Sequence, residues 1–211
     1  MQNNCDQLRI CGMRAADGGA HLLIEVETVT EQGKARESLA LLSARLTHLP
    51  KIGPITEAEL AELRREAEVC AAIGAGLRCL GAGGSSKRRL VEKLRLRGFD
   101  LETARTATEE LAAKGYLREE ESAVREAEKD LAKLWGDRRI LSDLQAKGYN
   151  GGALQYARAR LHTEDSVARC AQLMRKRHMA RPADEAEARK LFAALTRYGY
   201  SPEEIKKALQ K

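Results

Sequence analysis

Aromatic residues, proline and long apolar runs are all scarce in this chain of 211 residues. Aromatics make up only 4% of the sequence, and there are 4 prolines. A core with so few large rings suits many short helices of leucine and alanine better than a β-sandwich or barrel. No apolar run approaches the roughly 20 residues that a membrane span needs, and the start lacks a signal-peptide pattern. These absences predict a cytoplasmic, mainly helical protein without membrane contact.

Cysteine and histidine are also too few, and too irregularly spaced, to form a metal site. There is no Cys-x-x-Cys, and the four histidines form no cluster of ligands. Zinc sites and disulfide frameworks both need regular spacings, so we expect reduced thiols. No serine, cysteine or histidine has a recognisable nucleophile setting. We therefore expect no cofactor, no metal and no enzyme activity. The cysteines are Cys5, Cys11, Cys70, Cys79 and Cys170.

One pattern does recur three times, at intervals of about fifty residues. Its centre is a glycine followed by an aromatic residue: Gly98-Phe99, Gly148-Tyr149 and Gly199-Tyr200. Four residues earlier stands a leucine: Leu94, Leu144 and Leu195. Nine and ten residues earlier stands a basic pair: Arg88-Arg89, Arg138-Arg139 and Arg189-Lys190. Two residues later stands a capping residue: Asp100, Asn150 and Ser201. A repeat of this length indicates an array of similar supersecondary units.

The pattern predicts two helices joined by a tight turn. Leucines at one-turn spacing form an apolar stripe, and the glycine ends the helix in the left-handed conformation. The capping oxygen then begins the next helix. With one further helix before each pair, the sequence predicts nine helices in three sets: 57–80, 87–97, 101–113; 120–135, 138–147, 151–161; 164–179, 185–198, 202–210.

The first 55 residues differ from the rest and have β character. Residues 21–29 are rich in β-branched side chains and predict a strand, whereas 37–49 fits either a strand or a short helix. The predicted fold is an all-α tandem array of three three-helix repeats, with a small, partly β N-terminal segment. The predicted domains are 1–55, 56–118, 119–162 and 163–211.

Positive charge is the main functional signal. The net charge of +6 favours acidic partners, with nucleic acid first among them. A repeated position falls on the same side of an array, so the basic pairs predict a basic stripe for phosphates or an acidic protein groove. The alternative is a solvated helix face. The candidate partner- or DNA-binding residues are Arg88, Arg89, Lys93, Arg97, Arg138, Arg139, Lys147, Arg189 and Lys190.

Three other interpretations of the pattern are weaker. The aromatics after the glycines offer base stacking, although packing is their ordinary role. Two helices joined by a glycine turn also fit a helix-turn-helix that reads the major groove, although three tandem copies are unusual for it. The glycine-rich residues 81–86 before Lys87 invite a phosphate loop, but serine precedes that lysine, arginine follows it, and a helix is predicted in front.

From about residue 56 to 211, the sequence resembles the RecX family, bacterial regulators of the RecA recombinase. The matching elements are Ser86, Leu90, Leu94 and Arg97-Gly98-Phe99; then Gly136, Arg138-Arg139-Ile140, Leu144 and Lys147-Gly148-Tyr149; then Leu195, Gly199-Tyr200 and Ile205. One departure follows the first unit, where the family usually has Asp and later an aromatic before Ala. This chain has Glu119 and Ser122-Ala123 there. Residues 1–55 match weakly, so no family role is transferred to them.

The resemblance implies tandem three-helix repeats and a non-enzymatic, monomeric modulator in the cytoplasm. Such proteins bind along or at the end of RecA filaments on single-stranded DNA and usually inhibit them, in recombination, DNA repair and the SOS response. It also implies a weaker, direct contact with single-stranded DNA. The alternative function is a sequence-independent DNA-binding helical module that acts without a recombinase partner.

Overall fold

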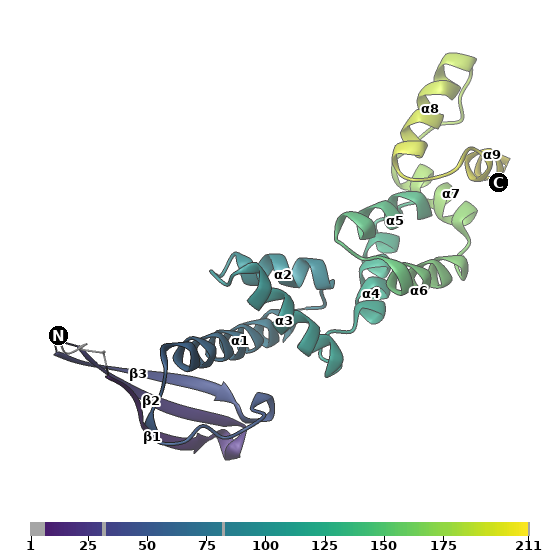
Figure 1. Ribbon diagram of the computed structural model, residues 1–211. Helices are drawn as coiled ribbons and strands as arrows, with labels where there is room; N and C mark the ends of the chain where they lie inside the picture. Colours follow the sequence, from purple (N-terminus) through teal and green to yellow (C-terminus); the bar gives the residue numbers. More distant parts are fainter. Residues whose placement is uncertain (1–6, 31–32, 82, 211) are drawn as a thin grey trace. The chain divides into compact units, whose positions relative to one another are not determined.

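The computed structural model describes residues 7–30, 33–81 and 83–210; Cys5 lies outside them. Most of this part of the chain is helical, with nine α-helices after a short run of strands (Figure 1). The chain divides into two compact units. The first contains Met1–Cys79 and Val91–Ala113, and the second contains Leu80–Leu90 and Lys114–Lys211. No described helix is long and apolar enough to cross a membrane.

The first unit begins with a four-stranded antiparallel sheet in the order β3-β2-β1-β4. The predicted strand 21–29 is confirmed as β2. The ambiguous stretch becomes the end of β3, followed by a 3-10 turn over Ser43–Arg45. The sequence did not predict β1. The strands are β1 Gln7–Ala16, β2 His21–Thr30, β3 Gly33–Leu42 and β4 Gly53–Pro54.

One face of this sheet is buried because alternate residues point to the same side of a strand. Leu22, Ile24 and Val26 on β2 and Ile10 on β1 are buried in one apolar cluster, which helix α1 (Glu57–Gly81) completes with Leu60. Figure 1 shows α1 lying across the sheet. The register of β1 against β2 shifts between Ile10 and Gly12. This bulge interrupts the period-two pattern, which is one reason the sequence did not reveal β1.

Helix α1 has a capped start and packs closely against α3. The Glu59 N–H donates to Thr56 Oγ1 (3.2 Å), and the Thr56 N–H donates back to Glu59 Oε2 (2.7 Å), which together form a capping box. A Cβ on Gly76 would lie 2.5 Å from Leu111 Cδ1. Gly76 therefore allows close contact between α1 and α3 (Leu101–Ala113).

Arg45, just after β3, joins the sheet to two helices of the same unit. Its Nε donates to Glu66 on α1 over 2.7 Å, and its Nη1 donates to Glu110 on α3. The side chain is only 22% exposed. Hydrogen bonds to the two carboxylates outweigh the effect of burial and raise the pKa of Arg45.

The remaining helices lie within a few residues of the predicted ranges. They are α2 Lys87–Arg95, α4 Glu119–Ala132, α5 Asp137–Ala146, α6 Gly151–His162, α7 Ser166–Lys176, α8 Glu185–Arg197 and α9 Pro202–Gln210. Helix α7 was predicted to begin at residue 164, directly after Thr163, but it begins at Ser166. The cap is Asp165, whose carboxylate accepts from the Ala168 N–H (2.9 Å). Aspartate and threonine both offer a side-chain oxygen that can accept from the first N–H groups of a helix, so residue type alone did not separate them.

The three glycine turns adopt the predicted conformation. Their φ angles are 96° at Gly98, 86° at Gly148 and 96° at Gly199. In each turn the N–H of the following aromatic donates to the carbonyl of the leucine four residues before the glycine. This is the bond that closes a Schellman motif. The N–H to O distances are 3.4 Å for Phe99–Leu94, 3.0 Å for Tyr149–Leu144 and 3.2 Å for Tyr200–Leu195.

Two of the three predicted caps after these turns form as expected. Asp100 accepts from the Thr103 N–H (2.8 Å), and Ser201 accepts from the Glu204 N–H (3.3 Å). The Asn150 side chain makes no capping bond, so that prediction is wrong. Gly151, directly after it, has a φ of 46° instead of the helical value, which changes the backbone path that a cap requires.

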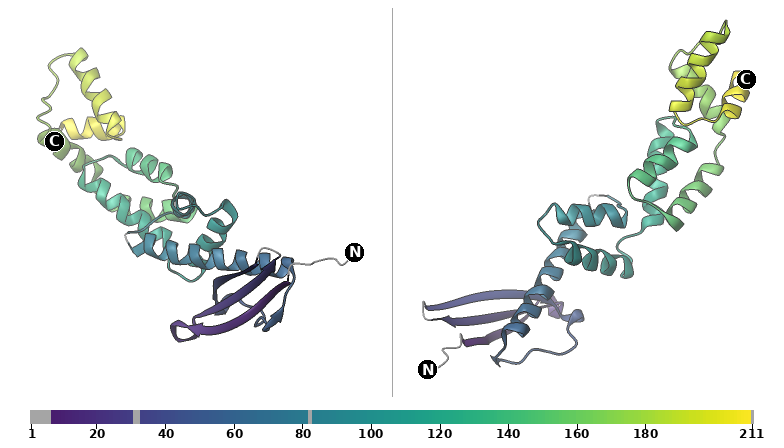
Figure 2. Two further views of the ribbon diagram at one scale, coloured as in Figure 1. Left: turned by 90° about the vertical axis from the view of Figure 1, so that its left-hand side faces the viewer. Right: turned by 45° about the horizontal axis from the view of Figure 1, so that its top comes forward.

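The second unit contains two apolar cores, one among α4, α5 and α6 and one among α7, α8 and α9; Figure 2 shows these helices. The core of α4, α5 and α6 is rich in alanine, which lets helices approach closely. Its buried residues are Ala123, Ala127, Ile140, Leu144, Tyr149, Ala153, Leu154, Ala157 and Leu161. The core of α7, α8 and α9 also includes Leu134 from the turn that follows α4. Its other buried residues are Cys170, Leu173, Met174, Leu195, Tyr200, Ile205 and Ala208.

Two of the glycine turns also pack against the start of an earlier helix. A Cβ on Gly148 would lie 2.8 Å from the Cβ of Arg88, on the first turn of α2. A Cβ on Gly199 would lie 2.4 Å from the Cβ of Arg139, on the first turn of α5, and 2.8 Å from the carbonyl oxygen of Gly136. Glycine is therefore required at both positions for two reasons: the backbone has a positive φ angle, and there is no space for a Cβ.

Replacing Gly199 with alanine should destabilise the protein more than the same change at Gly98. Both changes place a Cβ on a left-handed residue, at a cost of about 1–2 kcal/mol. Only Gly199→Ala also forces a Cβ against neighbouring backbone, and overpacking adds about 1–3 kcal/mol. The free energy of unfolding in urea, followed by circular dichroism, measures the difference. Equal losses for the two variants would contradict the close packing.

Candidate nucleic-acid interface

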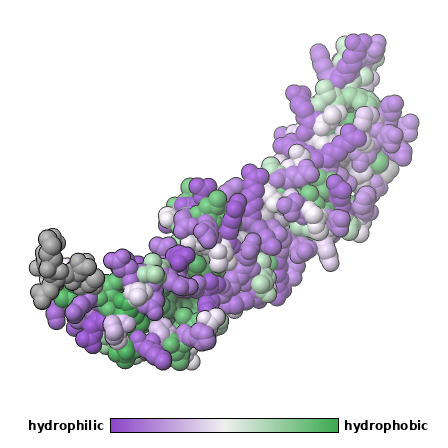
Figure 3. All heavy atoms as spheres, in the orientation of Figure 1, coloured by the Kyte–Doolittle hydropathy of each residue, from purple (hydrophilic) through white to green (hydrophobic). Residues whose placement is uncertain are grey.

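The nine candidate basic residues lie on the middle helix of each set or just past its end: α2, α5 and α8. Of these, Lys93 and Arg97 belong to the first compact unit, and the other seven belong to the second. In the face drawn in Figure 3, hydrophilic residues cover most of the helical part, whereas hydrophobic residues gather over the N-terminal sheet. The contacts of each basic side chain decide whether its charge remains available to a partner.

The first pair stands at the start of α2, where both side chains are exposed. Ser86 caps this helix by accepting from the Arg89 N–H (3.2 Å), and its hydroxyl donates to the Lys147 carbonyl (2.6 Å). The Glu119 carboxylate accepts from the Lys87 N–H (2.6 Å). The free amides that begin a helix attract anions, but here a carboxylate of the same unit occupies that place. This arrangement and the helix α1 in front argue further against a phosphate loop.

The second pair is divided between two roles. Arg138 is exposed, and no ion pair involves its side chain among the described residues. The Arg139 guanidinium lies 3.8 Å from the ring centroid of Trp135 and 5.8 Å from that of Tyr198. It also donates to the Arg197 carbonyl (3.4 Å). Arg139 therefore helps to hold the end of α8 on the start of α5 through cation–π and hydrogen-bond contacts.

The positive charge of Lys147 is already balanced inside the second unit. Its Nζ lies 2.7 Å from carboxylate oxygens of both Glu126 and Asp143, and its side chain is 25% exposed. Burial alone would raise the pKa of Glu126, but hydrogen bonds from Lys129 and Lys147 outweigh it and lower that pKa to about 2. At Lys147, burial alone would lower the pKa, but the hydrogen bonds to Asp143 and Glu126 outweigh burial and raise it.

The third pair occupies a different place on its helix. Helix α8 begins at Glu185, with Asp184 as its cap, so Arg189 and Lys190 stand in its second turn. Arg189 pairs with exposed Glu185 over 2.7 Å, and a surface pair of this kind is weak. Lys190 is exposed, and the structure gives it no ion pair among the described residues. The basic pairs align in the sequence relative to the glycine, but the third pair does not lie at the start of its helix as the first two do.

In the first unit, the two remaining candidates lie at the end of α2. Lys93 is half-buried and Arg97 is exposed. Arg97 Nη1 donates to the Lys93 carbonyl over 3.2 Å, which satisfies one of the carbonyls that a helix leaves free at its C-terminus.

The aromatics after the second and third glycines belong to the core. Tyr149 is 4% exposed and Tyr200 is fully buried, and the Tyr200 hydroxyl donates to the Leu134 carbonyl (2.9 Å). Burial raises the pKa of both tyrosines. Phe99 is half-buried. Buried rings have no face available for bases, so packing explains the two tyrosines.

Side chains able to bind metal do not gather in the described part of the chain, where no group of three or more His, Cys, Asp or Glu could hold an ion. The cysteines described are free thiols, and Cys70, Cys79 and Cys170 are buried. Burial raises the pKa of Cys170 to about 11, which keeps this thiol protonated and unreactive at neutral pH.

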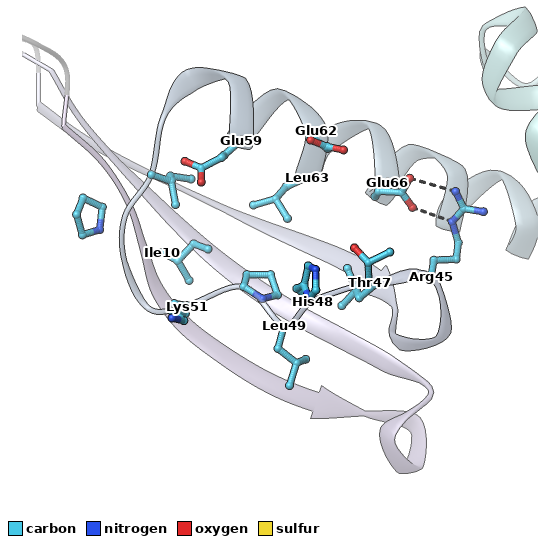
Figure 4. Close-up of a pocket in the computed structure, with 14 residues that line it drawn as sticks. Ile10, Arg45, Thr47, His48, Leu49, Lys51, Glu59, Glu62, Leu63 and Glu66 are labelled. Carbon is cyan, nitrogen blue, oxygen red and sulfur yellow. Dashed lines mark hydrogen bonds and ion pairs between the residues drawn. The ribbon is translucent and has the colours of Figure 1, made fainter.

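Sequence reasoning missed a pocket of about 730 Å³ in the first unit, between α1 and the loop after β3 (Figure 4). Glu62 and Leu63 line the pocket from α1, and His48 lines it from the loop. Ile10 of β1 also lines it. Arg45 and Glu66 close one end with their ion pair. The lining comes from a strand, a loop and a helix that are far apart in sequence, so no local motif marks it.

Comparisons with known proteins agree with this fold. No protein-family model matches the sequence, and no curated protein matches it significantly. A crystal structure described as regulatory protein RecX is similar with a TM-score of 0.75 and 17% identity, covering 97% of this chain and 100% of that chain. RecX from Lactobacillus salivarius has a TM-score of 0.57 and 16% identity, covering 68% of this chain and 95% of that chain. At these identities the likeness is one of fold, and it supports the resemblance seen in the sequence. The protein therefore has the fold of the RecX structures.

Proposed function

We propose that this protein is a RecX-type regulator that binds RecA filaments on single-stranded DNA and lowers their activity. It would act as a non-enzymatic monomer in the cytoplasm, in recombination, DNA repair and the SOS response. The observation that carries this proposal is the likeness to a regulatory protein RecX over nearly the whole length of both chains. A shared fold does not fix a function, so the proposal also draws on the sequence motifs and on the basic residues.

The proposal includes a tandem array of three repeats, 56–118, 119–162 and 163–211, after the N-terminal segment 1–55. The same turn closes three times with the same hydrogen bond. The same packing of a turn on the start of an earlier middle helix also occurs at Gly148 and Gly199. These recurrences support equivalent units stacked in order.

Contact with DNA phosphates would fall mainly on three cations: Arg89, Arg138 and Lys190. Each is exposed, and among the described residues none has an ion pair. Arg139 and Lys147, in contrast, are engaged inside the second unit. Because cations that approach phosphates release counterions, they set both the affinity and its dependence on salt.

A second candidate function is a DNA-binding module that acts without a recombinase. The net charge of +6 and the same three cations support it equally. The two functions differ in what excess DNA does, since a competitor for DNA is titrated away and a filament regulator is not.

In the first test, the protein should suppress DNA-dependent ATP hydrolysis by the RecA recombinase at or below equimolar amounts. The suppression should persist when excess single-stranded DNA is added, because the proposed contact is with the filament. ATP turnover measured with and without the added DNA decides between the candidates. Suppression that disappears with excess DNA would favour the simple DNA-binding module.

In the second test, the double change Arg89→Ala and Arg138→Ala should weaken binding to single-stranded DNA. The slope of log affinity against log salt should flatten by about 1.4 units, since each phosphate contact on a single strand contributes about 0.7. Fluorescence anisotropy over a salt series measures both quantities. The charge-matched control is Lys206→Ala with Lys207→Ala on α9, whose side chains are also exposed.

An unchanged slope in the double variant, with the fold intact by circular dichroism, would mean that these arginines form only a solvated face. Leu94→Ala serves as the folding control. Leu94 is completely buried, so this change should cost roughly 2–5 kcal/mol of stability without removing a cation.

A further inference from the structure

The C-terminal end of α2 presents an unusual combination of side chains. Leu96 is 88% exposed, the most of any large hydrophobic residue in the described part of the chain, and Leu101 beyond the turn is 40% exposed. Arg95 and Arg97 on either side of Leu96 are also exposed. We call residues 93–101 the α2 tip. A single exposed leucine is ordinary, so a role for Leu96 needs further evidence from the neighbouring backbone.

The fold does not require a leucine at this position. Two residues before the glycine, the other two sets have Ala146 and Arg197, and both are exposed. The core contact of the turn comes from the leucine four residues before the glycine, which is Leu94 here and is completely buried. Leu96 is therefore an apolar side chain directed away from the core that its own helix builds.

The backbone of the α2 tip is equally uncovered. Gly98 has a φ of 96°, as Gly199 does, but no atom of its own unit lies within 4 Å of where its Cβ would be. At Gly148 and Gly199 that space is filled by the start of an earlier helix. In the second unit, two turns of this type each contact the start of an earlier helix. The turn at Gly98 contacts no such element of its own unit.

The two covered turns indicate what kind of element fits the open one. Both receive the N-terminal end of a helix, and a group there donates to a carbonyl beside the glycine. Ser86 Oγ donates to the Lys147 carbonyl (2.6 Å), and the Gly136 N–H donates to the Tyr198 carbonyl (2.7 Å). Helix starts favour acidic side chains, and the cations of the α2 tip complement such a helix start.

We propose that the α2 tip is a protein-docking end that receives the acidic N-terminal end of a helix, with Leu96 inserted in an adjoining apolar depression. This rests on the proposed function, and the partner helix belongs to the recombinase of the filament. Nucleic acid fits less well, because the aliphatic Leu96 offers no ring for stacking.

The test compares Leu96→Asp with Ala146→Asp, which introduces the same charge at the equivalent exposed position of the next set. Binding of each full-length variant to RecA is measured by biolayer interferometry, both without DNA and on filaments. Leu96→Asp should weaken binding about tenfold or more, as loss of a central apolar anchor does, and Ala146→Asp should stay within about twofold. A second variant, Arg95→Glu with Arg97→Glu, should also weaken it.

Three results would overturn the docking proposal. Leu96→Asp could bind RecA as the unchanged protein does while its circular dichroism is preserved. It could instead weaken the affinity of the protein alone for single-stranded DNA more than Ala146→Asp does, which would make the α2 tip a DNA contact. Sedimentation could also show self-association that Leu96→Asp abolishes, which would make the occupant a second copy of this chain.

Failure of the proposed function gives a different result. In that case the unchanged protein shows no binding to RecA with or without DNA, and the partner of the α2 tip is then wrong as well. Binding by the unchanged protein with an unaffected Leu96→Asp variant removes the docking proposal and leaves the proposed function in place.

Discussion

The structure of the second unit depends on the close approach of a glycine turn to the first turn of an earlier helix. At Gly148 and Gly199 the available space is smaller than a methyl group, and a hydrogen bond to the adjacent carbonyl fixes the contact. This single contact satisfies polar groups at the end of one helix and positions the start of another. The aromatic after each of these two glycines points inward: its N–H closes the turn, and its ring is buried in the core.

The same contact separates the basic residues by role. Those nearest the approaching turn become part of the packing, as Arg139 does between Trp135 and Tyr198. Those one position away, such as Arg138, keep their charge in solvent. An alignment of the basic pairs treats both members as equivalent, whereas the geometry gives them different tasks. A neutral Arg139 variant would thus report on packing more than on binding.

Local sequence was enough to place the nine helices of the described residues within a few residues, because their ends have clear chemistry. Glycine at positive φ, leucines at one-turn spacing and capping residues such as Asp100 and Ser201 all act within a few residues of one another. Two local irregularities were not foreseen. Strand β1 contains a bulge at Cys11 and matches no simple alternation, and Asn150 lost its capping role to the conformation of Gly151.

Less of the candidate site was foreseen, because side-chain contacts such as that of Lys147 with Glu126 join residues that are distant in the sequence. Sequence identified which residues are cationic and which share a repeat position. It did not show that Lys147 faces two carboxylates or that α8 begins a turn early relative to α2 and α5. Nor did it mark Leu96, because a leucine within an amphipathic helix is expected in the core, and only the exposure of the side chain shows otherwise.

The boundary between the two compact units falls inside α1 and again inside α2, so neither unit is a single stretch of chain. During synthesis from the N-terminus, the sheet and most of α1 emerge first. Their unit is complete only after Glu110 on α3 can reach Arg45. Residues 80–90 emerge before residues 114–211, which form the rest of their unit. They therefore cannot make their native contacts until residues 114–211 have been synthesised. Because domains fold as units during synthesis, the second unit can close only after residues 114–211 emerge, although residues 80–90 of the same unit emerge before the first unit is complete.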